Sequence, residues 1–383
     1  MAALTWDMVR RRRLARHSLL QRVPSERLLD AVSGTCGIHA QVMAAAELSI
    51  GVRVELTRSA VRKALWEERR LCKTYGIRGT IHLFPASEVA LWMAAARARA
   101  ARAARDEARR LEYLGLEPAQ VVELVAAIRS ALDGRVLTLR ELGEEVVSRT
   151  GPWAAQTRNE AWVSGWPLWR TALGTAAAAG ALCFGPGRGN EVRFTRPDQW
   201  LPDWHEVDPD AALREVFRRY LHAFGPVGHG HFAAWFNLPP PAARDLVASL
   251  RRDLVEVDVE GTRLFLAEAD GDSYVEPERS LRLLPHFDCY LRGFHPRQQL
   301  TGGHEERAAG GTGRFPVLLI DGMVAGVWER RARRNRVEVR VEPFVRLTGE
   351  LRRRLEVEAF RIGEILEREA ELTVGPVAVR AHL

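Results

Sequence analysis

The chain has 383 residues, of which 46% are apolar and 27% charged, the composition of an ordinary globular protein with room for two to four domains. No apolar run reaches the ~20 residues needed to cross a bilayer, and the basic stretch Arg10–Arg16 has no apolar core or cleavage site behind it. We therefore expect a cytoplasmic protein without a membrane partner. The net charge of +7 favours a polyanionic partner, most commonly nucleic acid.

The basic residues are almost all arginine, since Lys63 and Lys73 are the only lysines among 56 basic side chains. This skew is typical of a GC-rich genome, so clusters of arginine carry more information than single ones. The four cysteines lie far apart, and the one close histidine pair, His229 and His231, has no cysteine or carboxylate cluster beside it. These patterns predict buried free thiols, no metal and no other cofactor.

Three consecutive segments show the same order of helices followed by a short sheet. In the first, expected over residues 1–110, helices are predicted from Pro24 to Gly34, from Gln41 to Val52 and from Ser59 onwards. The β-rich stretch Arg78–Phe84 follows. An Ala- and Arg-rich helix running to about Arg110 would link this segment to the next. Three helices followed by a small sheet are the ingredients of a winged helix.

The second and third segments, expected over residues 111–205 and 206–280, repeat this plan. The predicted helices are 118–132, 138–150 and 167–179, then 211–224, 229–236 and 241–252. Thr138 and Glu141 form a capping-box pattern, and Gly185–Asn190 is a turn between two strands rather than a phosphate loop, because no Gly-Lys-Ser/Thr follows. Gly261 is the predicted turn residue between strands 254–259 and 263–266.

The last segment, residues 281–383, changes to β structure. Strands are predicted over 281–284, 315–320, 323–329 and 336–342, and the glycine-rich stretch 301–313 predicts a loop. A charged helix is expected over 348–369, followed by a return to the sheet over 372–379.

Four stretches resemble one protein family when they are taken together: Cys36–Glu47, Arg78–Pro85, Leu283–Asp288, and Phe315–Gly322 with Gly326–Trp328 after it. The chain is similar to the AlkZ/YcaQ-like winged-helix DNA glycosylases over nearly its whole length. The resemblance implies an α+β fold in which three tandem winged-helix domains precede a small C-terminal β-barrel, around a concave DNA-binding face. It also implies repair of alkylated double-stranded DNA.

Active members of this family carry Gln-x-Gln or Gln-x-Asp at the start of an early helix, and the matching residues here are His39-Ala40-Gln41. By this resemblance Gln41 places a water and His39 accepts its proton, since the ordinary pKa of histidine, ~6.5, suits a base near neutrality. The two side chains point alike if the backbone is extended, but diverge by ~200° if it is helical. The alternative is that His39 caps a helix and Gln41 is polar surface.

The chemistry that fits these residues is hydrolysis of an N7-alkylated purine. Such a base already bears positive charge, so it leaves without strong acid help, and the enzyme must stabilise an oxocarbenium-like sugar and direct a water. A lyase reaction commonly needs an amine to form a Schiff base, and Lys63, Lys73 and the N-terminus are the available amines. A monofunctional glycosylase is therefore the better prediction.

A basic hairpin tip is the strongest candidate for DNA contact. It contains the arginines Arg330, Arg331, Arg333, Arg334 and Arg336. A projecting basic hairpin binds phosphates or enters a groove, and its alternative is a solvated turn in an arginine-rich protein. Arg78 and His82 flank the first wing as further candidates, with a packed, structural role as the alternative for His82.

Two other classes of function compete with this interpretation. A non-enzymatic winged-helix regulator would need dimer symmetry to recognise paired half-sites, and the sequence has neither coiled-coil heptads nor an evident dimer helix. A small-molecule hydrolase has little support, because there is no Gly-x-Ser-x-Gly elbow and no metal cluster. We therefore expect a monomeric enzyme that acts on alkylated double-stranded DNA.

Overall fold

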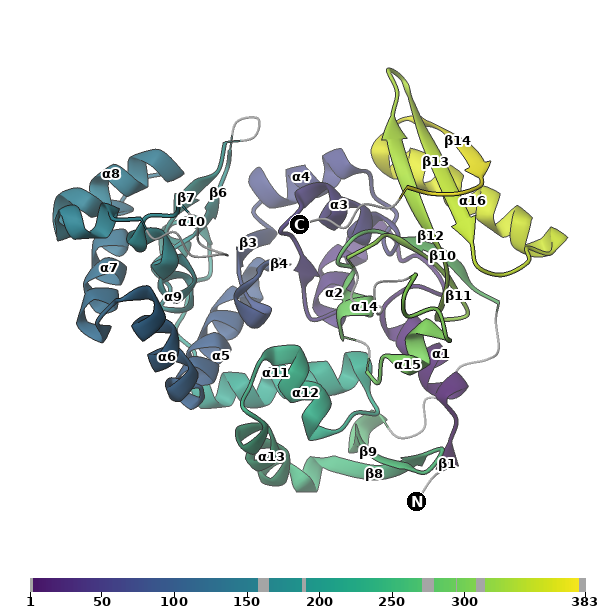
Figure 1. The fold of residues 1–383 in the computed structure, drawn as a ribbon, viewed down its shortest axis with the longest axis horizontal. Helices are drawn as coiled ribbons and strands as arrows, with labels where there is room; N and C mark the ends of the chain where they lie inside the picture. Colours follow the sequence, from purple (N-terminus) through teal and green to yellow (C-terminus); the bar gives the residue numbers. More distant parts are fainter. Residues whose placement is uncertain are drawn as a thin grey trace. The chain divides into compact units, whose positions relative to one another are not determined.

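The computed structural model describes residues 3–157, 165–187, 191–270, 279–293, 295–307 and 314–378 of a mixed α+β protein (Figure 1). Its α-helices are α1 Trp6–Arg16, α2 Leu28–Gly34, α3 Met43–Gly51, α4 Arg58–Trp66, α5 Val89–Arg102, α6 Ala104–Leu114, α7 Pro118–Ala131, α8 Leu139–Thr150, α9 Leu173–Ala178, α10 Pro197–Trp200, α11 Pro209–Phe224, α12 His229–Phe236, α13 Pro240–Ser249, α14 Cys289–Gly293, α15 Gln298–Thr301 and α16 Gly349–Leu366. Its strands are β1 Ala3–Leu4, β2 Ile38–His39, β3 Leu71–Tyr75, β4 Ile81–Pro85, β5 Leu137–Thr138, β6 Cys183–Gly185, β7 Arg193–Thr195, β8 Leu254–Val259, β9 Thr262–Ala267, β10 Leu281–Leu284, β11 Val317–Ile320, β12 Met323–Ala332, β13 Arg336–Pro343 and β14 Glu369–Val374.

The chain divides into two compact units. The first consists of Met1–Lys63, Phe217–Trp235 and Ala243–Leu383, and the second of Ala64–Val216 and Phe236–Ala242. Helices that the sequence predicted from apolar periodicity are present in each unit, within a few residues of their expected bounds. The expected helix running to Arg110 is instead two helices, α5 and α6, which meet at Ala103. The Ala- and Arg-rich sequence contains no glycine or proline that would have predicted this break.

A five-stranded sheet of order β10-β11-β12-β13-β14 forms the centre of the first unit. Neighbouring strands are antiparallel except β13 and β14, which run parallel because helix α16 connects them. The expected β-barrel is therefore a curled sheet, and its edge strands β10 and β14 do not pair with each other in the described part of the chain. Helix α16 packs against both edge strands.

Helix α1 was not predicted, because four consecutive arginines hide its buried face. Trp6 and Val9 pack with Val257 and Leu264 of the β8–β9 hairpin, and β1 pairs with β8. Arg13 is fully buried and donates hydrogen bonds to three backbone carbonyls, those of Phe224, His295 and Pro226. The N-terminal segment therefore packs with residues far along the chain.

Local signals in the other segments are confirmed. Thr138 caps α8, and its hydroxyl accepts from the Glu141 backbone N–H (3.1 Å) while the Glu141 carboxylate accepts from the Thr138 N–H (2.8 Å). The β8–β9 turn has Glu260 and Gly261 at φ 49° and 85°, as a tight hairpin requires. The predicted Gly185–Asn190 turn and Thr301–Gly313 loop extend over 188–190 and 308–313, which lie outside the described residues.

Candidate catalytic and DNA-binding site

The His39-Ala40-Gln41 motif lies in non-helical backbone in the first unit. Cys36 and Gly37, at φ 61° and 89°, reverse the chain after α2, and their N–H groups donate to the carbonyls of Ser33 and Val32 (both 2.9 Å). His39 ends strand β2, and α3 begins at Met43 rather than at the expected Gln41. The motif thus precedes the helix, so its two side chains are not subject to the divergence that helical backbone would impose.

The two candidate catalytic side chains differ in exposure. His39 is buried, with 8% of its surface exposed, whereas the side chain of Gln41 is exposed. The His39 ring lies 5.0 Å from the ring of Phe287, centroid to centroid. Gln41 is therefore open to solvent, while His39 lies in the interior beside an aromatic ring.

Phe287 belongs to a loop that is hydrogen-bonded to helix α3. Its φ of 59° is a genuine outlier for a bulky residue. A strained backbone of this kind persists only where the surrounding contacts fix the conformation. The neighbouring Asp288 is buried and accepts from the Arg53 guanidinium through both oxygens (2.7 and 2.8 Å) and from the Ser49 hydroxyl (2.6 Å). Burial acts to raise the pKa of Asp288, but the charge and hydrogen bonds of Arg53 outweigh it and lower that pKa.

The sequence did not predict the buried ion pair between Arg53 and Asp288. The Leu-Pro-His-Phe-Asp stretch carried a family resemblance, but nothing in it named Arg53, which lies 235 positions away, as the partner of Asp288. A lone arginine carries little signal in a chain so rich in this residue.

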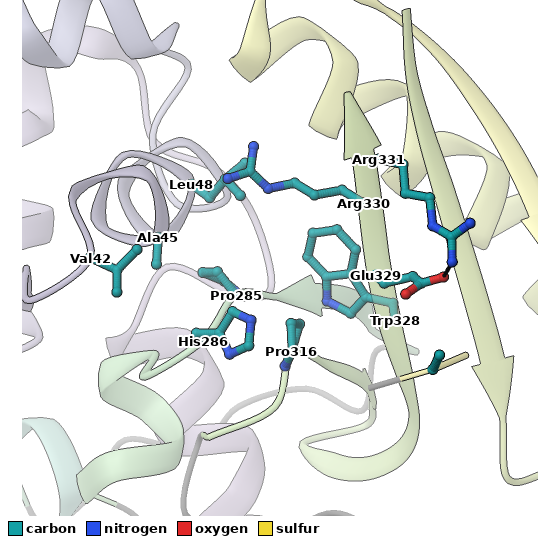
Figure 2. A pocket seen from close by; sticks show the side chains of 11 residues that line it. Val42, Ala45, Leu48, Pro285, His286, Pro316, Trp328, Glu329, Arg330 and Arg331 are labelled. Carbon is teal, nitrogen blue, oxygen red and sulfur yellow. Dashed lines mark hydrogen bonds and ion pairs between the residues drawn. The ribbon is translucent and has the colours of Figure 1, made fainter. Parts of the chain in front are cut away.

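A pocket of about 500 Å³ lies beside the motif (Figure 2). Its apolar wall includes Val42, which directly precedes α3, and Ala45 and Leu48 of α3. It also includes Trp328 of β12, whose indole N–H donates to the Leu284 carbonyl (2.8 Å). Because that bond fixes the indole, the wall is preformed.

Two polar side chains complete the pocket. His286 Nδ1 donates to the Arg314 carbonyl (2.7 Å), which leaves Nε2 as an acceptor in the neutral ring. Arg330 extends across the pocket toward Leu48, whereas Arg331 turns away and pairs with Glu329 (3.0 Å) (Figure 2). The pocket thus combines apolar walls with a cationic rim.

The predicted basic hairpin is present as β12 and β13, joined by residues 333–335. Its arginines are exposed, but several have acidic partners: Arg331 with Glu329, Arg333 with Glu338 (3.5 Å), and Arg336 with Glu369 (3.0 Å). Arg334, at the tip, has no ion-pair partner within the described part of the chain. The positive charge available to a polyanion is therefore concentrated at Arg334 and Arg330.

Arg78 and His82 belong to the second unit and are described within it. Arg78 is half-buried, at φ 57° in the β3–β4 connection. His82 is 4% exposed, stacks on Phe84 at 5.6 Å and has Nδ1 3.0 Å from the Thr80 carbonyl. This packing favours the structural alternative for His82, while contact of either residue with DNA stays a prediction.

No group of three or more metal-ligating side chains occurs among the residues that the structure describes. Of the close histidine pair, His231 accepts from the Gly228 N–H (3.2 Å), and burial lowers its pKa to about 4. Activity without a metal stays a prediction. The four cysteines are buried free thiols, as expected.

Comparison with known proteins agrees with these features. The family model described as "DNA glycosylase AlkZ-like" matches residues 32–365. The chain belongs to the AlkZ-like DNA glycosylase family. An interstrand DNA cross-link repair glycosylase from Streptomyces sahachiroi is 33% identical to this member over 311 residues, which cover 78% of this chain and 81% of the relative. The solved structure of the DNA glycosylase AlkZ from the same organism matches 98% of this chain and 100% of its own, with a TM-score of 0.80 and 29% identity.

Family membership makes this AlkZ-like protein an enzyme that acts on N-glycosyl bonds, with DNA as its partner. In the described part of the chain, no helix has both the length and the apolar character to span a membrane.

Proposed function

We propose that this AlkZ-like protein is a monofunctional glycosylase that hydrolyses the N-glycosidic bond of N7-alkylated purines in double-stranded DNA, including bulky adducts and cross-links. The observation that carries the proposal is that His39-Ala40-Gln41 lies in non-helical backbone just before α3. The printed function of the Streptomyces sahachiroi relative, interstrand cross-link repair, supports the wider substrate range.

In the proposed mechanism, the exposed Gln41 amide holds the attacking water, and His39 accepts the proton that the water loses. The positive charge of an N7-alkylpurine is neutralised when the base departs, so no strong acid is needed on the leaving group. The sugar develops oxocarbenium character before the water adds. The Phe287 ring, whose centroid lies 5.0 Å from that of the imidazole, restricts the movement of the imidazole while a proton is transferred.

We infer that the three helix-then-hairpin segments act as tandem winged-helix modules for DNA. The supporting order is α2, α3 and α4 before β3–β4, then α7, α8 and α9 before β6–β7, then α11, α12 and α13 before β8–β9. The expected module limits, 1–110, 111–205, 206–280 and 281–383, belong to this proposal. Arg330 and Arg334 supply phosphate contacts, so binding depends steeply on salt and weakly on sequence.

Single-turnover base release from duplex DNA that carries N7-methylguanine tests the assignment. Gln41→Ala should slow release by ~10²- to 10⁴-fold, the usual effect of losing a group that assists proton transfer, and should leave DNA affinity unchanged. Gln21→Ala, which removes an exposed glutamine outside the motif, is the matched control. Excision at the parent rate by Gln41→Ala would contradict the assignment.

The role of His39 is tested by two replacements. His39→Ala should slow release and remove its decline below neutral pH, because no imidazole then needs to be unprotonated. His39→Gln restores the commoner family motif and should keep activity. Borohydride should trap no covalent complex with Lys63 or Lys73. A parent enzyme that releases no base from any N7 adduct would favour a non-catalytic regulator instead.

A further inference from the structure

Helix α16 exposes large apolar side chains on the face that it turns away from the core of the first unit. Its buried face, which includes Leu351, Leu355 and Ile362, packs into the core around the five-stranded sheet. Phe360 and Val357 instead have 66% and 57% of their surfaces exposed. The two are three positions apart, so they are neighbours on the surface of the helix. Single exposed apolar residues are ordinary, but an adjacent pair of this size indicates a surface that binds a partner.

Unpaired positive charge lies at one end of this apolar pair. Arg353 stands four positions before Val357, so Arg353, Val357 and Phe360 form one stripe along the helix. Arg346, Arg352 and Arg353 are exposed, and none of them has an ion-pair partner within the described part of the chain. Their charge is therefore available to a partner, and a complementary acidic surface would be steered toward it.

The order of charges along α16 favours a protein partner over DNA. Glu356 and Glu364 are also exposed, and Glu364 continues the stripe four positions after Phe360. At ~1.5 Å of rise per residue, Arg353 and Glu364 lie roughly 16 Å apart along the helix, whereas duplex DNA carries one negative charge per ~1.7 Å. A DNA backbone along the stripe would meet the glutamates as well as the arginines. A polypeptide can confine its carboxylates to the arginine end and place apolar side chains against Val357 and Phe360.

We propose that the outer face of α16 docks a second protein through an acidic segment that carries neighbouring apolar side chains. Phe360 is the anchor with Val357 beside it, since exposed aromatic residues commonly dominate the binding energy of such contacts. Arg352 and Arg353 pair with the carboxylates of the partner and select acidic segments over basic ones. These residues all belong to the first unit, and none of them lines the pocket beside the motif, so the inference does not depend on the proposed function.

Binding of synthetic peptides to the full chain, measured by fluorescence anisotropy, tests the proposal. The probe is a labelled peptide that joins a run of glutamates to leucine and phenylalanine at helical spacing. One control peptide has lysine in place of the glutamates, and another has serine in place of the leucine and phenylalanine. The parent should bind the probe about 10-fold more tightly than either control peptide, because each control lacks one of the two matching features.

Variants of the helix face locate the contact. Phe360→Ser and Val357→Ser should each weaken binding of the probe by about 10-fold, the effect of truncating an interface anchor. Arg353→Glu should remove the preference for the glutamate peptide over the lysine peptide. Val374→Ser changes an exposed valine on β14, so it is the matched control and should bind the probe as the parent does. All four variants should release base at the parental rate, because none of them alters the motif.

Other outcomes would overturn the inference. One is failure of the parent to bind the probe at about 1 mM peptide, or binding that Phe360→Ser leaves unchanged. Another is binding of a single-stranded oligonucleotide that Phe360→Ser weakens, which would make this face a nucleic-acid surface. Self-association of the parent that Phe360→Ser abolishes in sedimentation would make it an interface between two copies of this chain. A parent that excises no N7 adduct would refute the proposed function, and peptide binding would still decide this inference.

Discussion

Replacement of Phe287 separates backbone strain from side-chain support at the candidate catalytic site. At its φ of 59°, the steric strain of a residue with a Cβ destabilises the folded state by ~1–2 kcal/mol, and glycine has no such strain. Phe287→Ala removes the ring and keeps the strain, whereas Phe287→Gly removes both. Glycine also loses ~0.5–1 kcal/mol more than alanine through its freer unfolded chain. The free energy of unfolding of Phe287→Gly should therefore exceed that of Phe287→Ala by roughly 1 kcal/mol or slightly less.

Base release should respond differently from stability. Both variants lose the ring that lies 5.0 Å from His39, so both should excise N7-methylguanine more slowly, up to ~10²-fold if the imidazole moves by about 1 Å. Phe287→Tyr keeps the ring and is the control. Denaturant unfolding and single-turnover base release measure the two effects. Alanine matching glycine in stability would refute the strain argument, and parental rates in both variants would refute the positioning role.

Three further outcomes follow from particular contacts. Arg334→Ala should reduce the slope of log affinity against log salt by ~0.9 for one lost phosphate contact, whereas Arg352→Ala, an exposed arginine of α16, should not. Asp288→Ala should lower the free energy of unfolding by ~3–5 kcal/mol, because it leaves the buried guanidinium of Arg53 without its carboxylate; a loss under 1 kcal/mol would contradict this. Burial lowers the pKa of His17 from 6.5 to about 3, so its stability contribution is complete above pH 6.5 and is lost as the pH falls toward 3. Urea unfolding should show that the free energy of unfolding falls more between pH 7 and pH 5 in the parent than in His17→Phe. An equal decrease in the two proteins would refute this role of His17.

The sequence predicted the elements whose signals are local. Alternation of Val337, Val339 and Val341 with polar residues predicted strand β13, and the run of arginines before it predicted the hairpin tip. Thr138 with Glu141 predicted the start of α8. In each case the residues that determine the structure lie within a few positions of one another, so no knowledge of the remaining fold is required.

Features that depend on distant partners were not predicted. Helix α1 shows no clear apolar face, because Arg13 is buried and finds its partners among carbonyls more than 200 positions away. The loop at Phe287 depends on Arg53 in the same way. The pocket likewise requires α3 and β12 to meet, and no spacing between Val42 and Trp328 encodes that contact. Tertiary burial of charged groups overrides the periodic pattern from which helices and sites are predicted.

Helix α3 explains how one site can combine fixed chemistry with a variable substrate. The helix is held by the Ser49–Asp288 hydrogen bond and by the Glu47–Arg62 ion pair (2.5 Å). A Cβ on Gly51 would lie 2.6 Å from Ile365 of α16, so this end of the helix also packs without free space. A motif that precedes so constrained a helix keeps its geometry when other walls of the site change. The opposite wall is β12, so we expect substrate range to depend on the β12 side chains at the pocket, while the reaction depends on the motif before α3.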